Sequence, residues 1–232
     1  MNCSCVLTAH DEGLILKPTL DSIVAAGRYL EVRGGRWELI IVADCADNAT
    51  KHVATEFCGS DALPWSIIET AFGEPGPARN AGIAAAKFDW IAIHDGDELV
   101  CENWFYAALT ALQRCPKGIA HSHWSLVFGQ DNLFWGHPHG NRTEWNDFEI
   151  SNPWSVQCVA SKAAFLEVPY RGYRDDETFE FEDWFWNAEV MRAGYQHIRI
   201  PDTVHGVRRK PVSRDLLARA NRKILQSIWS AR

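Results

Sequence analysis

Two carboxylates that could hold a metal ion follow an apolar segment near the middle of the chain. Residues 90–94 are mostly apolar and predict a strand, and Asp95, Gly96 and Asp97 come directly after it. Gly96 permits the tight turn that would let both aspartates converge at one point outside the sheet. Carboxylate oxygens at that spacing suit Mg²⁺ or Mn²⁺, which keep open positions for a substrate's phosphates. The triplet therefore predicts a site for a metal–diphosphate unit, although Asp-Gly-Asp is also ordinary turn chemistry.

Two further apolar segments in the first half of the chain also run into acids. Residues 4–9 precede Asp11 and Glu12, and residues 38–43 precede Asp44. In an open α/β sheet, ligands bind at the carboxyl ends of the strands. We therefore expect the three acidic loops to share one rim, a convergence that turn chemistry alone does not explain.

The elements that must position these acids alternate between strand-like and helix-like segments. This alternation favours a mainly parallel central sheet with flanking helices. The predicted strands are 3–9, 38–43, 64–69, 90–94, 119–128 and 196–200, and the predicted helices are 13–27, 47–57, 77–87, 102–114 and 182–193. With 232 residues, of which 47% are hydrophobic, the chain can bury one large core. The expectation is an α/β fold in a single compact domain.

Composition narrows the class of protein further. No segment approaches the roughly 20 apolar residues that span a bilayer, and no secretion signal is recognisable, which favours a soluble cytoplasmic protein. The seven cysteines lack metal-type spacing, so we expect reduced, mostly buried thiols. A net charge of −7 argues against a general nucleic-acid-binding surface.

The C-terminal segment differs in charge from the rest of the chain. From His205 to Arg232 there are eight basic residues and one acid. Residues 207–232 predict a basic helix whose apolar stripe consists of Val212, Leu216, Ala220, Ile224 and Ile228. A helix that docks on the core needs only the stripe, whereas a helix at a membrane surface uses both the stripe and the cations. Both readings remain open, and peripheral membrane contact is the hypothesis to test.

Several short motifs occur in an order that resembles the family 2 glycosyltransferases, enzymes of nucleotide sugars with the GT-A fold. The motifs are residues 6–12, 37–44, 76–82, 95–97, 181–184, 192–195 and 200–205. The resemblance implies a GT-A domain over residues 1–206. Its nucleotide-sugar half would cover about 1–100 and its acceptor half about 101–206.

The resemblance also implies a donor site with a metal ion. Asp97 matches the principal metal ligand, Asp95 reaches the metal or the ribose, and His205 completes the metal shell. The implied donor-binding residues are Thr8, His10, Glu12, Asp44, Arg79, Asp95, Arg208 and Arg209. Arg79 alternatively forms a structural salt bridge, and Arg208, Arg209 and Lys210 alternatively form a solvated basic run. The implied cofactor is Mn²⁺ or Mg²⁺, because a diphosphate leaving group needs its charge neutralised. The implied donor is a nucleoside-diphosphate sugar, with a UDP-sugar favoured.

Two adjacent acids match the catalytic position of the family. Glu182 and Asp183 begin a predicted helix, whose dipole favours ionised carboxylates. By the resemblance, Asp183 is the general base that deprotonates an acceptor hydroxyl for direct, inverting displacement. Glu182 is the alternative base, because the register is uncertain by one residue.

Aromatic residues between 121 and 154 fall where the family binds its acceptor. Trp124, Trp135 and Trp154 are the candidate acceptor-binding residues, since indole faces suit sugar rings. Packing against the sheet is the alternative for such residues. A glycan or a lipid-linked acceptor is the implied partner.

The sequence thus indicates a metal-dependent, inverting glycosyltransferase. Two alternatives stay open. A nucleotidyltransferase-like enzyme would call for a glycine-rich phosphate loop after the first strand, and residues 8–12 are not one. A catalytically silent sugar-nucleotide or glycan-binding module would have no need for acids at every rim position and at 182–183.

Overall fold

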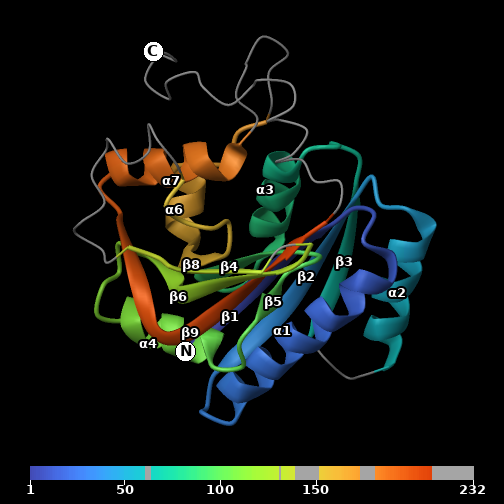
Figure 1. The fold of residues 1–232 in the computed structure, drawn as a ribbon, viewed down its shortest axis with the longest axis horizontal. Helices are drawn as coiled ribbons and strands as arrows, with labels where there is room; N and C mark the ends of the chain where they lie inside the picture. The colour runs from blue at the N-terminus through green and yellow to red at the C-terminus, as the bar shows by residue number, and fades with distance from the viewer. Residues whose placement is uncertain (61–63, 131, 139–151, 173–180, 211–232) are drawn as a thin grey trace.

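A nine-stranded sheet forms the centre of the molecule, and helices lie on both of its faces (Figure 1). The structure is a computed structural model, and it describes residues 1–60, 64–130, 132–138, 152–172 and 181–210. The strand order is β3-β2-β1-β4-β8-β6-β9-β5, with β7 paired to β6. The strands are β1 Asn2–Ala9, β2 Arg36–Asp44, β3 Trp65–Thr70, β4 Trp90–Asp95, β5 Leu99–Val100, β6 Gly118–Gly129, β7 Leu133–Gly136, β8 Cys158–Ser161 and β9 Gln196–Arg209.

The first half of the chain forms the parallel part of the sheet. β1 lies between β2 and β4, and β3 pairs with the far side of β2, all in parallel register. The connecting helices are α1 Leu16–Glu31, α2 Asn48–Ser60 and α3 Pro75–Ala85. Parallel neighbours need such crossover connections, which the sequence pattern predicted. This half places the carboxyl ends of β1, β2 and β4 along one edge.

The strands of the second half form mostly antiparallel pairs, so the sheet is mixed rather than mainly parallel. β8 runs antiparallel to β4 and β6, β7 antiparallel to β6, and β5 antiparallel to β9, whereas β6 and β9 are parallel. For β7 the physical reason is connection length. Only residues 130–132 join β6 to β7, too few for a crossover, so the chain returns as a hairpin.

The last strand extends well beyond its predicted end. β9 was expected over residues 196–200, but it continues to Arg209, with a register irregularity opposite Ser122–Trp124. Residues 207–209, predicted as the start of a basic helix, therefore belong to this strand. The rest of that predicted helix, residues 211–232, lies outside the described part of the chain.

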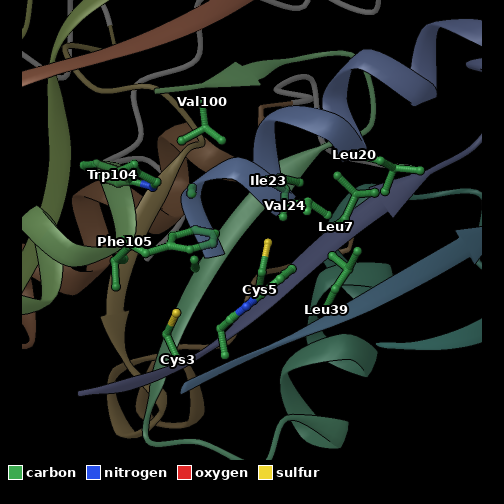
Figure 2. Close-up of a cluster of buried hydrophobic side chains, with 14 of the residues drawn as sticks. Cys3, Cys5, Leu7, Leu20, Ile23, Val24, Leu39, Val100, Trp104 and Phe105 are labelled. Carbon is green, nitrogen blue, oxygen red and sulfur yellow. The ribbon is translucent and has the colours of Figure 1, made fainter. Parts of the chain in front are cut away.

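Apolar layers on the two faces of the sheet make up the core. Figure 2 shows Cys3, Cys5 and Leu7 of β1 facing side chains of α1 and of α4, Trp104–Leu112. The opposite face packs against α3, α6, Lys162–Glu167, and α7, Glu182–Arg192. All seven cysteines are free, and four of them are buried, as expected from the sequence. Among the described helices, none is both long and apolar enough to cross a membrane.

Helix α3 packs closely against the sheet, and this contact sets the distance between the helix and the strands. A Cβ at Gly82 would lie 2.4 Å from a methyl carbon of Val6 and 2.8 Å from one of Val42. Only glycine allows this approach. The approach matters because Arg79, one turn earlier on α3, reaches the end of β4.

Candidate active site

A cleft of about 670 Å³ opens at the carboxyl ends of β1, β2 and β4. Its lining contains acids from all three strand ends, so the three acidic loops share one rim as the sequence predicted. The predicted site residues that line it are Thr8, His10, Glu12, Asp44, Arg79, Asp95, Asp97, Trp135, Glu182, Asp183 and Arg208. His205, Arg209, Trp124 and Trp154 are not among its lining residues.

The turn after β4 is built for close packing against the end of β1. A Cβ at Gly96 would lie 3.0 Å from the carbonyl oxygen of Thr8 and 3.1 Å from the carboxyl carbon of Glu12. Asp95 Oδ1 accepts hydrogen bonds from Thr8 Oγ1 at 3.1 Å and from Arg79 Nη2 at 2.8 Å. Burial opposes ionisation of Asp95, but Arg79 and these hydrogen bonds outweigh it and lower its pKa. Asp95 is therefore held as an oriented carboxylate.

Arg79 forms the salt bridge that the sequence offered as the alternative to donor binding. Its side chain is only 2% exposed, and its Nη1 donates to Glu182 Oε1 at 2.5 Å while Nη2 donates to Asp95. These bonds join α3, β4 and α7. Arg79 therefore positions Asp95 and Glu182, and because it also lines the cleft, a contact with the donor stays a prediction.

Asp97 carries the second carboxylate of the turn and is contacted by the end of β9. Lys210 Nζ lies 2.9 Å from Asp97 Oδ2 and 3.9 Å from Glu12 Oε1. Arg208 Nε donates to the Asp97 carbonyl oxygen at 3.2 Å. Burial raises the pKa of both Asp97 and Glu12, and the charge of Lys210 opposes that rise.

His205 does not take the predicted place in a metal shell. It pairs with Val100 within the sheet, its ring is fully buried, and its Nε2 lies 2.7 Å from Glu98 Oε2. Burial raises the pKa of Glu98 and lowers that of His205 to about 3, so the interior disfavours the charged form of both groups. The sequence suggested that His205 follows a strand and a turn. Instead β9 runs through it and holds it in the interior.

The acids that remain fit a metal ion that arrives with its substrate. Within the described ranges, no group of three or more His, Cys, Asp or Glu residues is placed to hold a metal ion. Asp95 and Asp97 supply two carboxylates, which is the number that Mg²⁺ uses when substrate phosphates complete its shell. The two carboxylates therefore suit a cation whose remaining positions are filled by a diphosphate and water.

Glu182 and Asp183 begin α7 but lie in different environments. Glu182 is paired with Arg79, whereas Asp183 Oδ2 accepts a hydrogen bond from Asn152 Nδ2 at 3.0 Å. Burial and the charge of Glu182 raise the pKa of Asp183 to about 7. Asn152 was not predicted as a site residue, because no motif surrounds it. Its Oδ1 accepts from Asn187 Nδ2 of α7 at 3.1 Å, which fixes the amide that supports Asp183.

Asp44 holds the loop that leads into α3. Its carboxylate accepts hydrogen bonds from Thr70 Oγ1 at 2.8 Å, from the Phe72 amide at 2.7 Å and from the Glu74 amide at 3.1 Å. Its carbonyl oxygen lies 2.8 Å from His10 Nδ1. The residue lines the cleft while shaping its wall, and a contact with the base or ribose stays a prediction.

The three candidate acceptor tryptophans divide between surface and core. Trp135 is 40% exposed and lines the cleft. Trp124 is stacked between the rings of His123 and Phe134, at centroid distances of 4.6 and 4.7 Å. Trp154 is 2% exposed and stacks on His121 and His197. The structure therefore corrects the assignment of Trp154, whose indole is a packing element with no free face.

The fold is that of the GT-A glycosyltransferases. TarS from S. aureus, residues 1–349 with UDP-GlcNAc, aligns with a TM-score of 0.70 at 13% identity, over 92% of this chain and 60% of that one. The mannosyltransferase PcManGT from Pyrobaculum calidifontis, with GDP-Man and Mn²⁺, gives 0.63 at 13% identity, over 91% and 57%. GalNAc-T7 with UDP, GalNAc and Mn²⁺ gives 0.65 at 13% identity, over 90% and 44%.

The chain belongs to glycosyl transferase family 2, whose model matches residues 4–174. Comparison with curated protein sequences gave no match. The chain spans about 60% of the length of the TarS fragment, and at 13% identity the structural likeness defines the fold. The particular donor, acceptor and mechanism are therefore argued from the site.

Proposed function

We propose that this protein transfers a sugar from a nucleoside-diphosphate sugar to an acceptor hydroxyl, with inversion at the anomeric carbon. The observation that carries the proposal is the meeting of two kinds of acid in one cleft. Asp95 and Asp97 suit a cation–diphosphate unit, and Asp183, whose pKa burial and Glu182 raise to about 7, suits proton abstraction near neutral pH. The solved structures with UDP-GlcNAc and with GDP-Man support a nucleotide sugar as the donor.

In the proposed reaction, the Asp183 carboxylate removes the proton of the acceptor hydroxyl as that oxygen attacks the anomeric carbon. The new bond joins the acceptor oxygen to the sugar, and the bond between the sugar and the diphosphate breaks. The nucleoside diphosphate leaves with the electron pair. Direct displacement of this kind inverts the anomeric configuration, and Arg79 keeps Glu182 and Asp95 in place beside it.

A divalent cation is part of the proposal. Asp97 and Asp95 would hold Mn²⁺ or Mg²⁺ together with the diphosphate, and its charge would neutralise the departing group. The presence of Mn²⁺ in the PcManGT and GalNAc-T7 structures supports this choice. A UDP-sugar remains the favoured donor. A glycan or a lipid-linked acceptor in the cytoplasm, reached at the membrane surface, is the proposed acceptor class.

A donor panel with a matched pair of variants tests the proposal. Release of nucleoside diphosphate from UDP- and GDP-sugars is measured with Mn²⁺ and with EDTA, in the wild type, in Asp97→Asn and in Asp21→Asn. Asp21 is an exposed residue of α1 that pairs with Lys17, so its variant controls for net charge. We expect at least one donor to turn over with Mn²⁺, Asp97→Asn to lose Mn²⁺-dependent donor binding and turnover together, and Asp21→Asn to match the wild type.

The outcomes separate the alternatives that the sequence left open. Pyrophosphate release from a nucleoside triphosphate would favour a nucleotidyltransferase, and donor binding without turnover on any acceptor would favour a silent binding module. Unchanged Mn²⁺-dependent donor affinity in Asp97→Asn would refute the metal assignment.

A further inference from the structure

The cation position beside Asp97 is taken by a side chain of the protein itself. Lys210 Nζ lies 2.9 Å from Asp97 Oδ2 and 3.9 Å from Glu12 Oε1, so one ammonium serves two carboxylates. Both carboxyl groups are mostly enclosed, with side-chain exposures of 14% for Asp97 and 9% for Glu12. Carboxylates held close together in a partly dry site repel each other, and a shared cation relieves that repulsion. Lys210 therefore supplies positive charge at the position where a metal ion would supply it when the donor binds.

Arg208 and Lys210 are held in different ways. Arg208 is anchored by its hydrogen bond to the Asp97 carbonyl oxygen, and its guanidinium lies 4.6 Å from the ring centroid of Phe128. The pairing of β9 with β6 ends at Arg209, opposite Gly129. Lys210 is the next residue, beyond the last strand pair, and its ammonium sits on a flexible four-carbon stem.

Two cations cannot share Asp97 without a cost. A divalent ion bound through the Asp95–Asp97 turn would lie beside the ammonium of Lys210, and like charges at such separation repel. Loading of the metal–diphosphate unit therefore requires that Lys210 leave the carboxylate. The incoming diphosphate offers the displaced ammonium a new anionic partner within the same cleft, whose lining includes Lys210.

We propose that Lys210 is an exchangeable internal cation. It compensates the charge of Asp97 and Glu12 before the donor binds, gives up Asp97 to the divalent metal, and then pairs with the diphosphate of the donor. This inference rests on the proposed function, since it assigns a role in the loading of the same site. Lys210 would then compete with the metal and pair with the nucleotide. Its side chain would weaken metal binding and strengthen nucleotide binding.

Lys210→Met tests the proposal because it should change two affinities in opposite directions. Mn²⁺ binding to the nucleotide-free protein is followed through the free-Mn²⁺ spin-resonance signal, and UDP and GDP binding at saturating Mn²⁺ by calorimetry. We expect Mn²⁺ to bind about three- to tenfold more tightly and the nucleotide about three- to tenfold more weakly, the scale of one partly exposed ion pair. Lys210→Arg should stay near the wild type, and Lys51→Met, which removes an exposed lysine paired with Glu69, should change neither affinity.

Each result bears on one claim. A purely structural role for Lys210 predicts weaker binding of both ligands in Lys210→Met, and that result would overturn the proposal, as would unchanged Mn²⁺ affinity. Failure of the wild type to bind UDP or GDP would count against the proposed function, whereas the Mn²⁺ measurement on nucleotide-free protein would still decide the exchange at Asp97. The wild type could also bind the nucleotide equally well with and without Mn²⁺, and lose that binding in Lys210→Met. This result would overturn the displacement of Lys210 by the metal and leave the lysine as the permanent cation of the site.

Discussion

At the scale of single residues, two adjacent acids acquire different tasks from their surroundings. Glu182 forms a salt bridge with Arg79 at 2.5 Å, while Asp183 accepts a hydrogen bond from the uncharged amide of Asn152. Burial disfavours the ionised form of a carboxyl group, and a neighbouring negative charge adds to that effect. The pKa of Asp183 is therefore raised to about 7, which is the behaviour of a general base.

Asp183→Asn should leave donor binding close to that of the wild type and lower sugar transfer by about 10²–10⁴-fold. The pH profile provides the second signature. Asp183 acts only when ionised, so with a pKa of about 7 the wild-type kcat/KM should fall tenfold per unit as the pH drops below about 7. The residual activity of the variant should lack this acid limb. Loss of donor binding would move Asp183 into the donor site, and an acid limb below pH 5 would place the base elsewhere.

At the scale of elements, one arginine ties three segments of the fold together. Arg79 on α3 contacts Asp95 at the end of β4 and Glu182 at the start of α7. Gly82 allows the close approach of α3 to β1 and β2 that brings the guanidinium to this depth. These ion pairs therefore fix the position of the turn at Asp95 relative to the start of α7 at Glu182.

Arg79→Met should lower the free energy of unfolding by about 3–5 kcal/mol, because it leaves two partly buried carboxylates without their cation. Urea denaturation at pH 7 measures this loss. The loss should shrink at pH 5. In the variant, burial raises the pKa of Asp95 and Arg79 no longer lowers it, so this carboxyl group becomes protonated and needs no counter-charge. The matched control is Lys87→Met, which removes an exposed lysine paired with Glu38 and should cost no more than about 1 kcal/mol. A pH-independent loss would show that Arg79 acts through packing.

At the scale of the whole molecule, positive charge gathers where the described chain ends. Arg208 and Lys210 reach the cleft, and beyond them the sequence carries Arg214, Arg219, Arg222 and Lys223. A segment with this many basic residues would attract the protein to an anionic membrane surface, where the proposed lipid-linked acceptor would be found. Each basic residue near such a surface contributes about 1 kcal/mol, and salt screens the attraction.

The full-length protein should therefore co-sediment with anionic vesicles at low salt, and far less with neutral vesicles or at high salt. Replacing Arg214, Arg219, Arg222 and Lys223 by Gln should abolish the binding and leave the thermal transition unchanged. Equal, negligible binding of the wild type to both kinds of vesicle would contradict the membrane contact and favour a soluble acceptor.

The sequence by itself determined the α/β fold, the family and the convergence of acids at one rim. These follow from local order along the chain, because an apolar strand, a turn and a crossover helix are each encoded in a few consecutive residues. Asp95 and Asp97 could be predicted in this way, since one turn positions both. The mixed second half of the sheet could not, because the direction of β8 and β9 depends on which distant strands they join.

Only the tertiary structure decided which of the predicted residues are free to act. Burial of His205 against Glu98, the stacking of Trp154 on histidines and the enclosure of Arg79 between two acids are contacts between residues far apart in the chain. The division between Glu182 and Asp183 and the position of Lys210 on Asp97 arise in the same way. Residue types and spacing state what chemistry a side chain can do, but its desolvation and its partners decide whether it does so, and these exist only once the chain has folded.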